Sequence, residues 1–326
     1  MAIIDKPSDY FNTSAVWSGD DSEHTISGIG HQPNFTWIKG VNIGTQHYLF
    51  DSVRGATKVI ISNGTNAEFT VAQTLKSWNS DGFVLGTSDD VNGSGRTYIA
   101  WNWKESATAG FDILTYEGSG SAQTISHNLG VKPDMIIVKN IDSSDPPFNW
   151  RVYHSSLGAE VAMKLNGTDA QSADPGYWND TEPTSSVFSV KNSGETNNSG
   201  QTYIAYLFAG KQGYSKFGSY VGNGNADGTF VYTGFKPAWV VVKQSSAAGE
   251  GWYMWDNKRD VFNAATNFLT INTVAAQGAG VDMDMVSNGF KHRYSGAASN
   301  SAATYIYWAF AENPFVTSTG VPATAR

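Results

Sequence analysis

The stretch Pro33-Asn34-Phe35-Thr36-Trp37-Ile38-Lys39 returns twice, as Pro133–Lys139 (PDMIIVK) and Pro237–Lys243 (PAWVVVK). In all three stretches the lysine follows the proline by six positions, and the prolines are 133 − 33 = 100 and 237 − 133 = 104 residues apart. Common solenoid repeats are about 20–50 residues long, whereas this period has the size of a small domain. The sequence therefore predicts three tandem repeats, at residues 1–108, 109–212 and 213–326.

A second anchor closes each repeat: Thr97–Ala100, Thr202–Ala205 and Thr304–Tyr307. With the period of two that a strand imposes, one face of each closing strand is apolar. These faces are Ile99/Trp101/Trp103, Ile204/Tyr206/Phe208 and Ile306/Trp308/Phe310. We expect each face to be buried against a facing sheet.

The strand after each proline is β-branched or aromatic and apolar on both faces, which is typical of an interior strand. We expect the inner faces to include Trp37, Ile137 and Val241, together with Trp101, Tyr206 and Trp308. Lys39, Lys139 and Lys243 should occupy equivalent positions at the strand exit when the three units are superposed, each with its ammonium group in water.

Composition agrees with an all-β protein. The chain has 34 glycines in 326 residues, 13% aromatic residues and only 15% charged residues, with abundant Ser, Thr and Asn. This favours many short strands joined by tight turns over disorder. No segment keeps the helical period of 3.6. The predicted fold is three tandem, jelly-roll-like β-sandwiches.

Charge and residue usage exclude several classes of function. A net charge of −8 argues against nucleic-acid binding, and the lack of cysteine excludes disulfides and thiolate chemistry. The start of the chain has no charged leader followed by a long apolar run, and no stretch approaches 18 apolar residues. We expect synthesis in a cytoplasm without a signal peptide, no membrane insertion, and release by host lysis.

Several strings resemble a repeat module of tailed bacteriophages, especially marine ones. They are Leu49–Thr57, Ser80–Gly86, Tyr98–Lys104, Gly213–Tyr220 and Phe310–Phe315. The resemblance covers nearly the whole chain and implies a virion protein of tail-fibre or head-decoration type. It brings no catalytic residues with it.

Asp51 and Arg54 recur at the same spacing as Asp256 and Arg259, while the middle repeat has His154 and Leu157. An Asp–Arg pair can fork onto a sugar hydroxyl or a carboxylate. The alternative, which we favour, is a structural ion pair in a turn.

Trp78 and Trp178 lie in polar connections, each followed by Asn. Indoles on loops suit sugar stacking or protein contact. The alternative, which we favour, is that they cap the end of the sandwich as part of its core, because most large aromatic residues are mainly buried.

The sequence contains no constellation typical of catalysis. The six histidines show no paired metal spacing, and no serine has glycine at both −2 and +2. The string Asp90-x-Asn92-x-Ser94-Gly95 resembles the start of a calcium loop, but position twelve is Trp101, so a polar turn is favoured. We therefore predict no catalytic residue, no metal and no cofactor.

We expect a non-enzymatic virion protein that contacts other virion proteins and forms a homo-oligomer. Tail fibres are usually trimers, so a trimer is one expected form. Contact with a host surface glycan fits the same role. A carbohydrate-binding module is the alternative, and a glycan-degrading enzyme is the third.

Overall fold

The computed structural model describes residues 4–142 and 146–311, and it is almost entirely β. In these residues the α-helices are α1 (Asp89–Asn92), α2 (Pro175–Trp178) and α3 (Gly194–Asn197), and a 3-10 turn, η1, spans Pro7–Asp9. The described residues contain no helix long and apolar enough to cross a membrane. The all-β class predicted from the sequence is confirmed.

Three large antiparallel sheets form the body of the molecule, one within each of the three segments that the sequence predicts as repeats. The first has the order β1-β10-β4-β5-β6-β7, with β2 also paired to β10. Its strands are β1 (Phe11–Thr13), β2 (Trp17–Ser18), β4 (Phe35–Gly40), β5 (His47–Asp51), β6 (Lys58–Ile61), β7 (Phe69–Thr70) and β10 (Thr97–Trp103).

The second sheet repeats this order as β11-β18-β13-β14-β15-β16. Its strands are β11 (Phe111–Glu117), β13 (Met135–Asn140), β14 (Arg151–His154), β15 (Val161–Lys164), β16 (Ser172–Ala173) and β18 (Thr202–Phe208).

The third sheet begins in the same order, β19-β26-β21-β22-β23-β24, and continues through β25 to β20. Its strands are β19 (Ser215–Val221), β20 (Phe230–Tyr232), β21 (Pro237–Gln244), β22 (Trp252–Asp256), β23 (Ala265–Thr270), β24 (Gly278–Val286), β25 (Gly289–His292) and β26 (Thr304–Ala311).

Two smaller sheets cover the outer side of the first two repeats. They are β3-β9-β8 and β12-β17. Their strands are β3 (His24–Ile26), β8 (Leu75–Asn79), β9 (Gly82–Leu85), β12 (Gln123–Ser126) and β17 (Val187–Val190). In the third repeat the corresponding strands, β20 and β25, belong to the large sheet.

The register agrees between the three large sheets at the sequence anchors. Lys39 lies opposite Ile99, Lys139 opposite Ile204, and Lys243 opposite Ile306. The proline strand and the closing strand are therefore neighbours with the same alignment each time.

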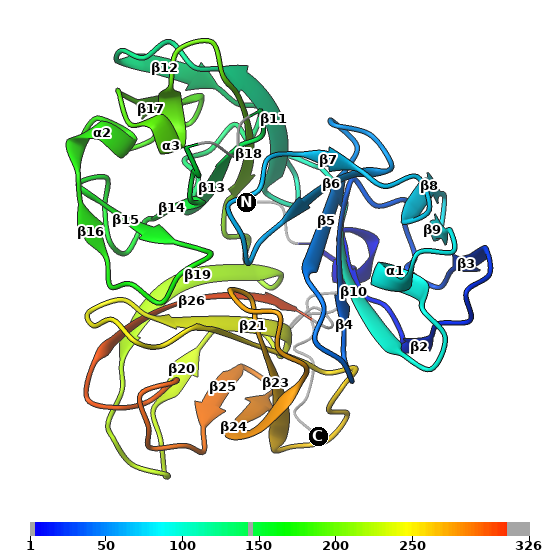
Figure 1. Ribbon diagram of the computed structural model, residues 1–326. Coiled ribbons are helices and arrows are strands. Elements are labelled where there is room, and N and C mark those ends of the chain that lie inside the picture. Colours follow the sequence, from blue (N-terminus) through cyan, green and yellow to red (C-terminus); the bar gives the residue numbers. More distant parts are fainter. Residues whose placement is uncertain (1–3, 143–145, 312–326) are drawn as a thin grey trace.

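The three large sheets surround a common centre (Figure 1), and one apolar cluster joins them there. All six expected inner-face residues are buried in it. The sequence predicts that a facing sheet of the same sandwich buries each of these faces. Instead, each face packs against the equivalent faces of the other two large sheets. Trp103, for example, contacts the rings of Phe35, Phe208 and Trp239, one from each repeat.

The opposite face of each large sheet contributes to a separate outer cluster. One such cluster surrounds Phe83 in the first repeat, one Phe188 in the second and one Phe290 in the third. The described residues thus form one shared central core and three outer cores.

Equivalent hydrogen bonds close the three repeats into a ring. The backbone N–H of Glu68 donates to the Ile141 carbonyl at 2.9 Å, Gln171 to Ser245 at 2.9 Å, and Gln277 to Val41 at 2.8 Å. Each repeat therefore binds the next one, and the third binds the first.

The expectation that the three lysines reach water is wrong. Lys39, Lys139 and Lys243 are fully buried, and each ammonium group donates a hydrogen bond to the backbone carbonyl of the next residue in its strand. The Lys39 Nζ donates to the carbonyls of Gly40 and Val274, at 3.1 and 3.3 Å. Burial lowers the pKa of each of the three lysines to about 8.

Candidate functional site

The predicted Asp51–Arg54 pair lies at the junction of the first and second repeats. The Asp51 carboxylate accepts from Nε of Arg54 at 2.6 Å and from its backbone N–H at 2.9 Å. Nη2 of the same guanidinium donates to the Leu49 carbonyl at 3.0 Å. Nη1 donates to the Lys58 carbonyl at 3.3 Å and to the Glu68 carboxylate at 3.4 Å. Because both side chains are buried and bonded to protein groups, their geometry is that of a structural ion pair.

Tyr206 of the second repeat completes this pair. Its hydroxyl donates to Oδ2 of Asp51 at 2.6 Å. Burial and the neighbouring Asp51 carboxylate raise the pKa of the Tyr206 hydroxyl well above its ordinary value, so the hydroxyl remains a donor. The pair thus links two repeats across the central core.

Asp256 and Arg259 form the same buried arrangement in the third repeat. Nε of Arg259 donates to Asp256 at 2.6 Å, and Nη2 donates to the Met254 carbonyl at 3.1 Å. In the middle repeat, His154 takes the place of the aspartate, and its Nε2 lies 3.2 Å from the Tyr307 carbonyl oxygen. Burial lowers the pKa of His154 to about 4, so the ring is neutral at pH 7.

Trp78 and Trp178 do not lie on exposed loops. Trp78 belongs to β8, is half-buried, and donates through Nε1 to the Thr36 hydroxyl at 3.1 Å. Trp178 ends α2 and is buried against Tyr153, with the ring centroids 6.1 Å apart. Both indoles fit the interpretation that they belong to the outer cores.

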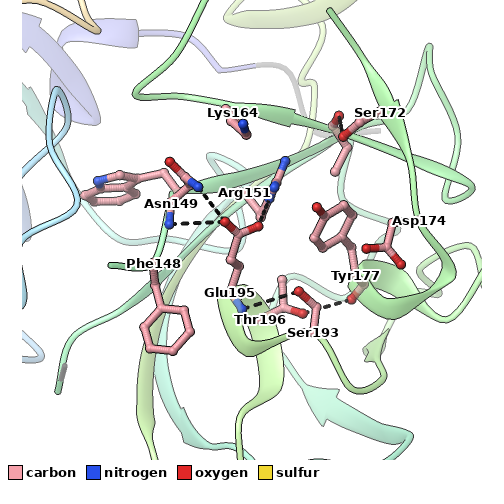
Figure 2. A network of polar contacts seen from close by, with 12 residues as sticks. Phe148, Asn149, Arg151, Lys164, Ser172, Asp174, Tyr177, Ser193, Glu195 and Thr196 are labelled. Carbon is pink, nitrogen blue, oxygen red and sulfur yellow. Dashed lines mark hydrogen bonds and ion pairs between the residues drawn. The ribbon is translucent and has the colours of Figure 1, made fainter. Parts of the chain in front are cut away.

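A polar network specific to the second repeat joins β14 to α2 and α3 (Figure 2). Arg151 pairs with Glu195 through Nε, and its guanidinium carbon lies 4.1 Å from the ring centroid of Tyr177. The other carboxylate oxygen of Glu195 accepts from the side-chain amide of Asn149 at 2.6 Å. Figure 2 shows Arg151 between the carboxylate and the aromatic ring.

Two helix N-caps hold the elements of this network in place. Asp174 caps α2 by accepting from the Gly176 N–H at 2.8 Å, and Ser193 caps α3 by accepting from the Glu195 N–H at 3.3 Å. The two short helices are then tied by the Thr196 hydroxyl, which donates to the Tyr177 carbonyl at 3.2 Å. The result is a brace in which Glu195 accepts from Nε of Arg151 and from both the backbone N–H and the side-chain amide of Asn149.

Sequence reasoning missed Arg151, Tyr177 and Glu195. A usable signal was present, because Arg151 occupies the β-strand position that Tyr48 and Tyr253 fill in the other repeats. A charge at a position that is otherwise aromatic requires a partner, and here it is Glu195.

A cavity of about 220 Å³ lies near the start of the chain's first strand. Polar residues Ser8, Asn12, Asn257 and Lys258 line it together with Phe11, Ala238 and Ala311. Within the described lining Lys258 is the only charged residue, so the cavity offers no paired acid and base. Among residues 4–142 and 146–311, no three His, Asp or Glu side chains gather as a metal site.

A family model for a domain of unknown function, DUF7483, matches residues 6–314. The chain belongs to this family. The match treats the three repeats as one domain, in agreement with their shared core. Comparison with curated proteins and with solved structures found no match.

Proposed function

We propose that the chain is a non-enzymatic structural protein of a bacteriophage particle, as a tail-fibre or appendage component or as a head decoration. The observation that carries the proposal is the ring of three sheets, closed by equivalent hydrogen bonds around one aromatic core. Such a body is rigid and presents three outer faces, on which binding residues can vary without disturbing the core.

The use of the polar residues supports a non-enzymatic role. Three buried or partly buried carboxylates each bind an arginine of the same repeat: Asp51, Asp256 and Glu195. A general base needs a carboxylate within reach of substrate, and these are held by several donors inside the fold.

The phage assignment rests on the resemblance of the repeat strings described above. Of these, Glu312–Phe315 lies outside the described residues. The proposal includes a triplicated module with bounds near residues 108 and 212, supported by the shared strand order of the three sheets. Its partners are other virion proteins and further copies of the chain, which need not form a trimer because one chain already supplies three similar sheets.

Mass spectrometry of gradient-purified virions tests the proposal. We expect peptides of the chain in the particles at a fixed ratio to the major capsid protein, while abundant host cytoplasmic proteins are depleted. A chain absent from particles but plentiful in the infected-cell lysate would contradict the virion role. Turnover of bacterial polysaccharide that is lost on replacing one carboxylate would contradict the non-enzymatic role.

A further inference from the structure

The outer face of β20 presents two aromatic rings to solvent. Phe230 is 45% exposed and Tyr232 is 55% exposed, while Val231 between them is buried in the outer core of the third repeat. Because side chains alternate along a strand, the two rings share one face. In Figure 1, β20 and β25 lie at the outside of the molecule, away from the common centre.

The other two repeats show that the fold does not need these rings. Val231 pairs with Phe290 as Ile26 pairs with Phe83 and Ile125 pairs with Phe188. This register places small, exposed hydroxyl residues at the two positions in the other repeats, namely Thr25 and Ser27, and Thr124 and Ser126. An exposed Phe and Tyr in place of Thr and Ser contribute little to folding, and therefore point to contact with something outside the chain.

Neighbouring groups hold both rings in place. Cε2 of Phe230 lies 3.0 Å from the point where a Cβ on Gly289 would stand, so the ring lies close against the bare backbone of β25. Lys216 Nζ is 5.1 Å from the ring centroid of Tyr232 and donates to its carbonyl at 2.7 Å. Rings fixed in this way lose little entropy when a ligand stacks on them.

Alternating charges border the rings. Lys291, which lies opposite Phe230, pairs with Asp227 at 2.7 Å. Arg293 lies 3.5 Å from the same carboxylate and 2.6 Å from Asp284. These four side chains are partly exposed and offer both donors and acceptors along one edge of the aromatic pair.

We infer that the outward face of β20 is a saccharide-binding surface. The C–H face of a pyranose ring stacks on Phe230 and Tyr232, and its hydroxyls exchange hydrogen bonds with Asp227, Lys291 and Arg293. A sugar needs an aromatic face beside mixed donors and acceptors, and the two occur here together. A stable protein interface would need about 1,200–2,000 Å² of buried surface, far more than two aromatic side chains supply.

This inference goes beyond the proposed virion role and does not depend on it, because binding is measured on the isolated full chain. The probe is an array of bacterial surface oligosaccharides, including lipopolysaccharide O-chains, capsular fragments and peptidoglycan fragments. We expect the chain to bind at least one class, and calorimetric titration then gives the affinity for that oligosaccharide.

The deciding variant is Phe230→Thr with Tyr232→Ser, which copies the residues of the other repeats and should therefore fold. We expect at least a tenfold loss of affinity. The matched control is Phe69→Thr, which removes an exposed aromatic ring from β7 in the first repeat and should leave the affinity unchanged.

Three results would overturn the inference. One is a wild-type chain that binds no oligosaccharide on the array. Another is a double variant with the affinity of the wild type. The third is a wild-type chain that self-associates in sedimentation experiments through this face, with association abolished by the double variant, since the rings would then be a contact between copies.

Discussion

The centre of the molecule and its outer faces follow different rules. At the centre the three repeats make equivalent contacts from equivalent positions. The ring nitrogens of His47, Trp150 and Trp252 each lie within hydrogen-bond distance of a carbonyl oxygen of the neighbouring repeat, on Thr270, Ile61 and Lys164 respectively. On the outer faces the repeats diverge, with the Arg151–Glu195 brace in the second and the Phe230–Tyr232 pair in the third. The comparison indicates that the centre maintains the fold and that individual outer faces carry recognition.

The largest expected effect is that of Trp103→Ala, at the centre. Trp103 touches rings of all three repeats, and removing a buried tryptophan typically costs about 3–5 kcal/mol. Urea unfolding followed by circular dichroism should show this loss in a single transition. Trp78→Ala, at a half-buried outer position, is the control and should cost clearly less. Equal losses in the two variants would contradict the distinction between centre and periphery.

Tyr206→Phe removes one hydrogen bond between repeats. The hydroxyl donates to a buried carboxylate, and such bonds contribute about 1.5–3 kcal/mol. Tyr116→Phe is matched to it, because the Tyr116 hydroxyl donates to the neutral Thr196 carbonyl within one repeat, which is worth about 0.5–1.5 kcal/mol. We expect Tyr206→Phe to lose more stability than Tyr116→Phe, and the free energies of unfolding of both variants measure this. A larger loss for Tyr116→Phe would contradict the expectation.

His292→Val should make the free energy of unfolding less dependent on pH in acid. His292 is buried beside Tyr220, and burial lowers its pKa to about 3. Below pH 6.5 the unfolded chain therefore binds a proton that the folded chain refuses, so stability falls as the pH falls from about 6.5 towards 3. Val190 occupies the equivalent position in the second repeat, so the replacement should fit.

The expected change is a reduction of the acid slope by up to ~1.4 kcal/mol per pH unit, the value for one proton. Unfolding free energies at pH 7.5, 6, 5 and 4 give this slope. Parallel pH curves for the variant and the wild type would show that His292 is not the source.

The smallest expected effect lies on the outer face of β20. Phe230→Thr with Tyr232→Ser should change the free energy of unfolding by less than about 1 kcal/mol, because both rings are half-exposed and the other repeats fold with these residues. Thermal unfolding of the double variant measures this. A loss of several kcal/mol would mean that the rings stabilise the fold rather than serve a ligand.

Much of the fold could be predicted from the sequence, because strand alternation fixes which side chains share a face. For that reason the sequence alone predicts that Ile99, Trp101 and Trp103 form a buried face, and all three are buried. Alternation does not say what covers a face, so the shared centre could not be foreseen. Nor could the burial of Lys39, because the Val274 carbonyl that binds it lies 235 residues away in the sequence.

The candidate site was less accessible to sequence reasoning. The recurring Asp51–Arg54 spacing predicted an ion pair correctly, but its third member, Tyr206, belongs to another repeat. The Arg151–Glu195 pair spans 44 residues and becomes visible only when the repeats are aligned strand by strand.

Native-state hydrogen exchange tests most directly whether the three repeats form one body around a common core. The closing strands β10, β18 and β26 each contribute to the central cluster, so their slowest amides should exchange with the same free energy, equal to that of global unfolding. If the strands of one repeat exchange with a distinctly lower free energy while the other two stay protected, the repeats are independent domains and the shared-core interpretation fails.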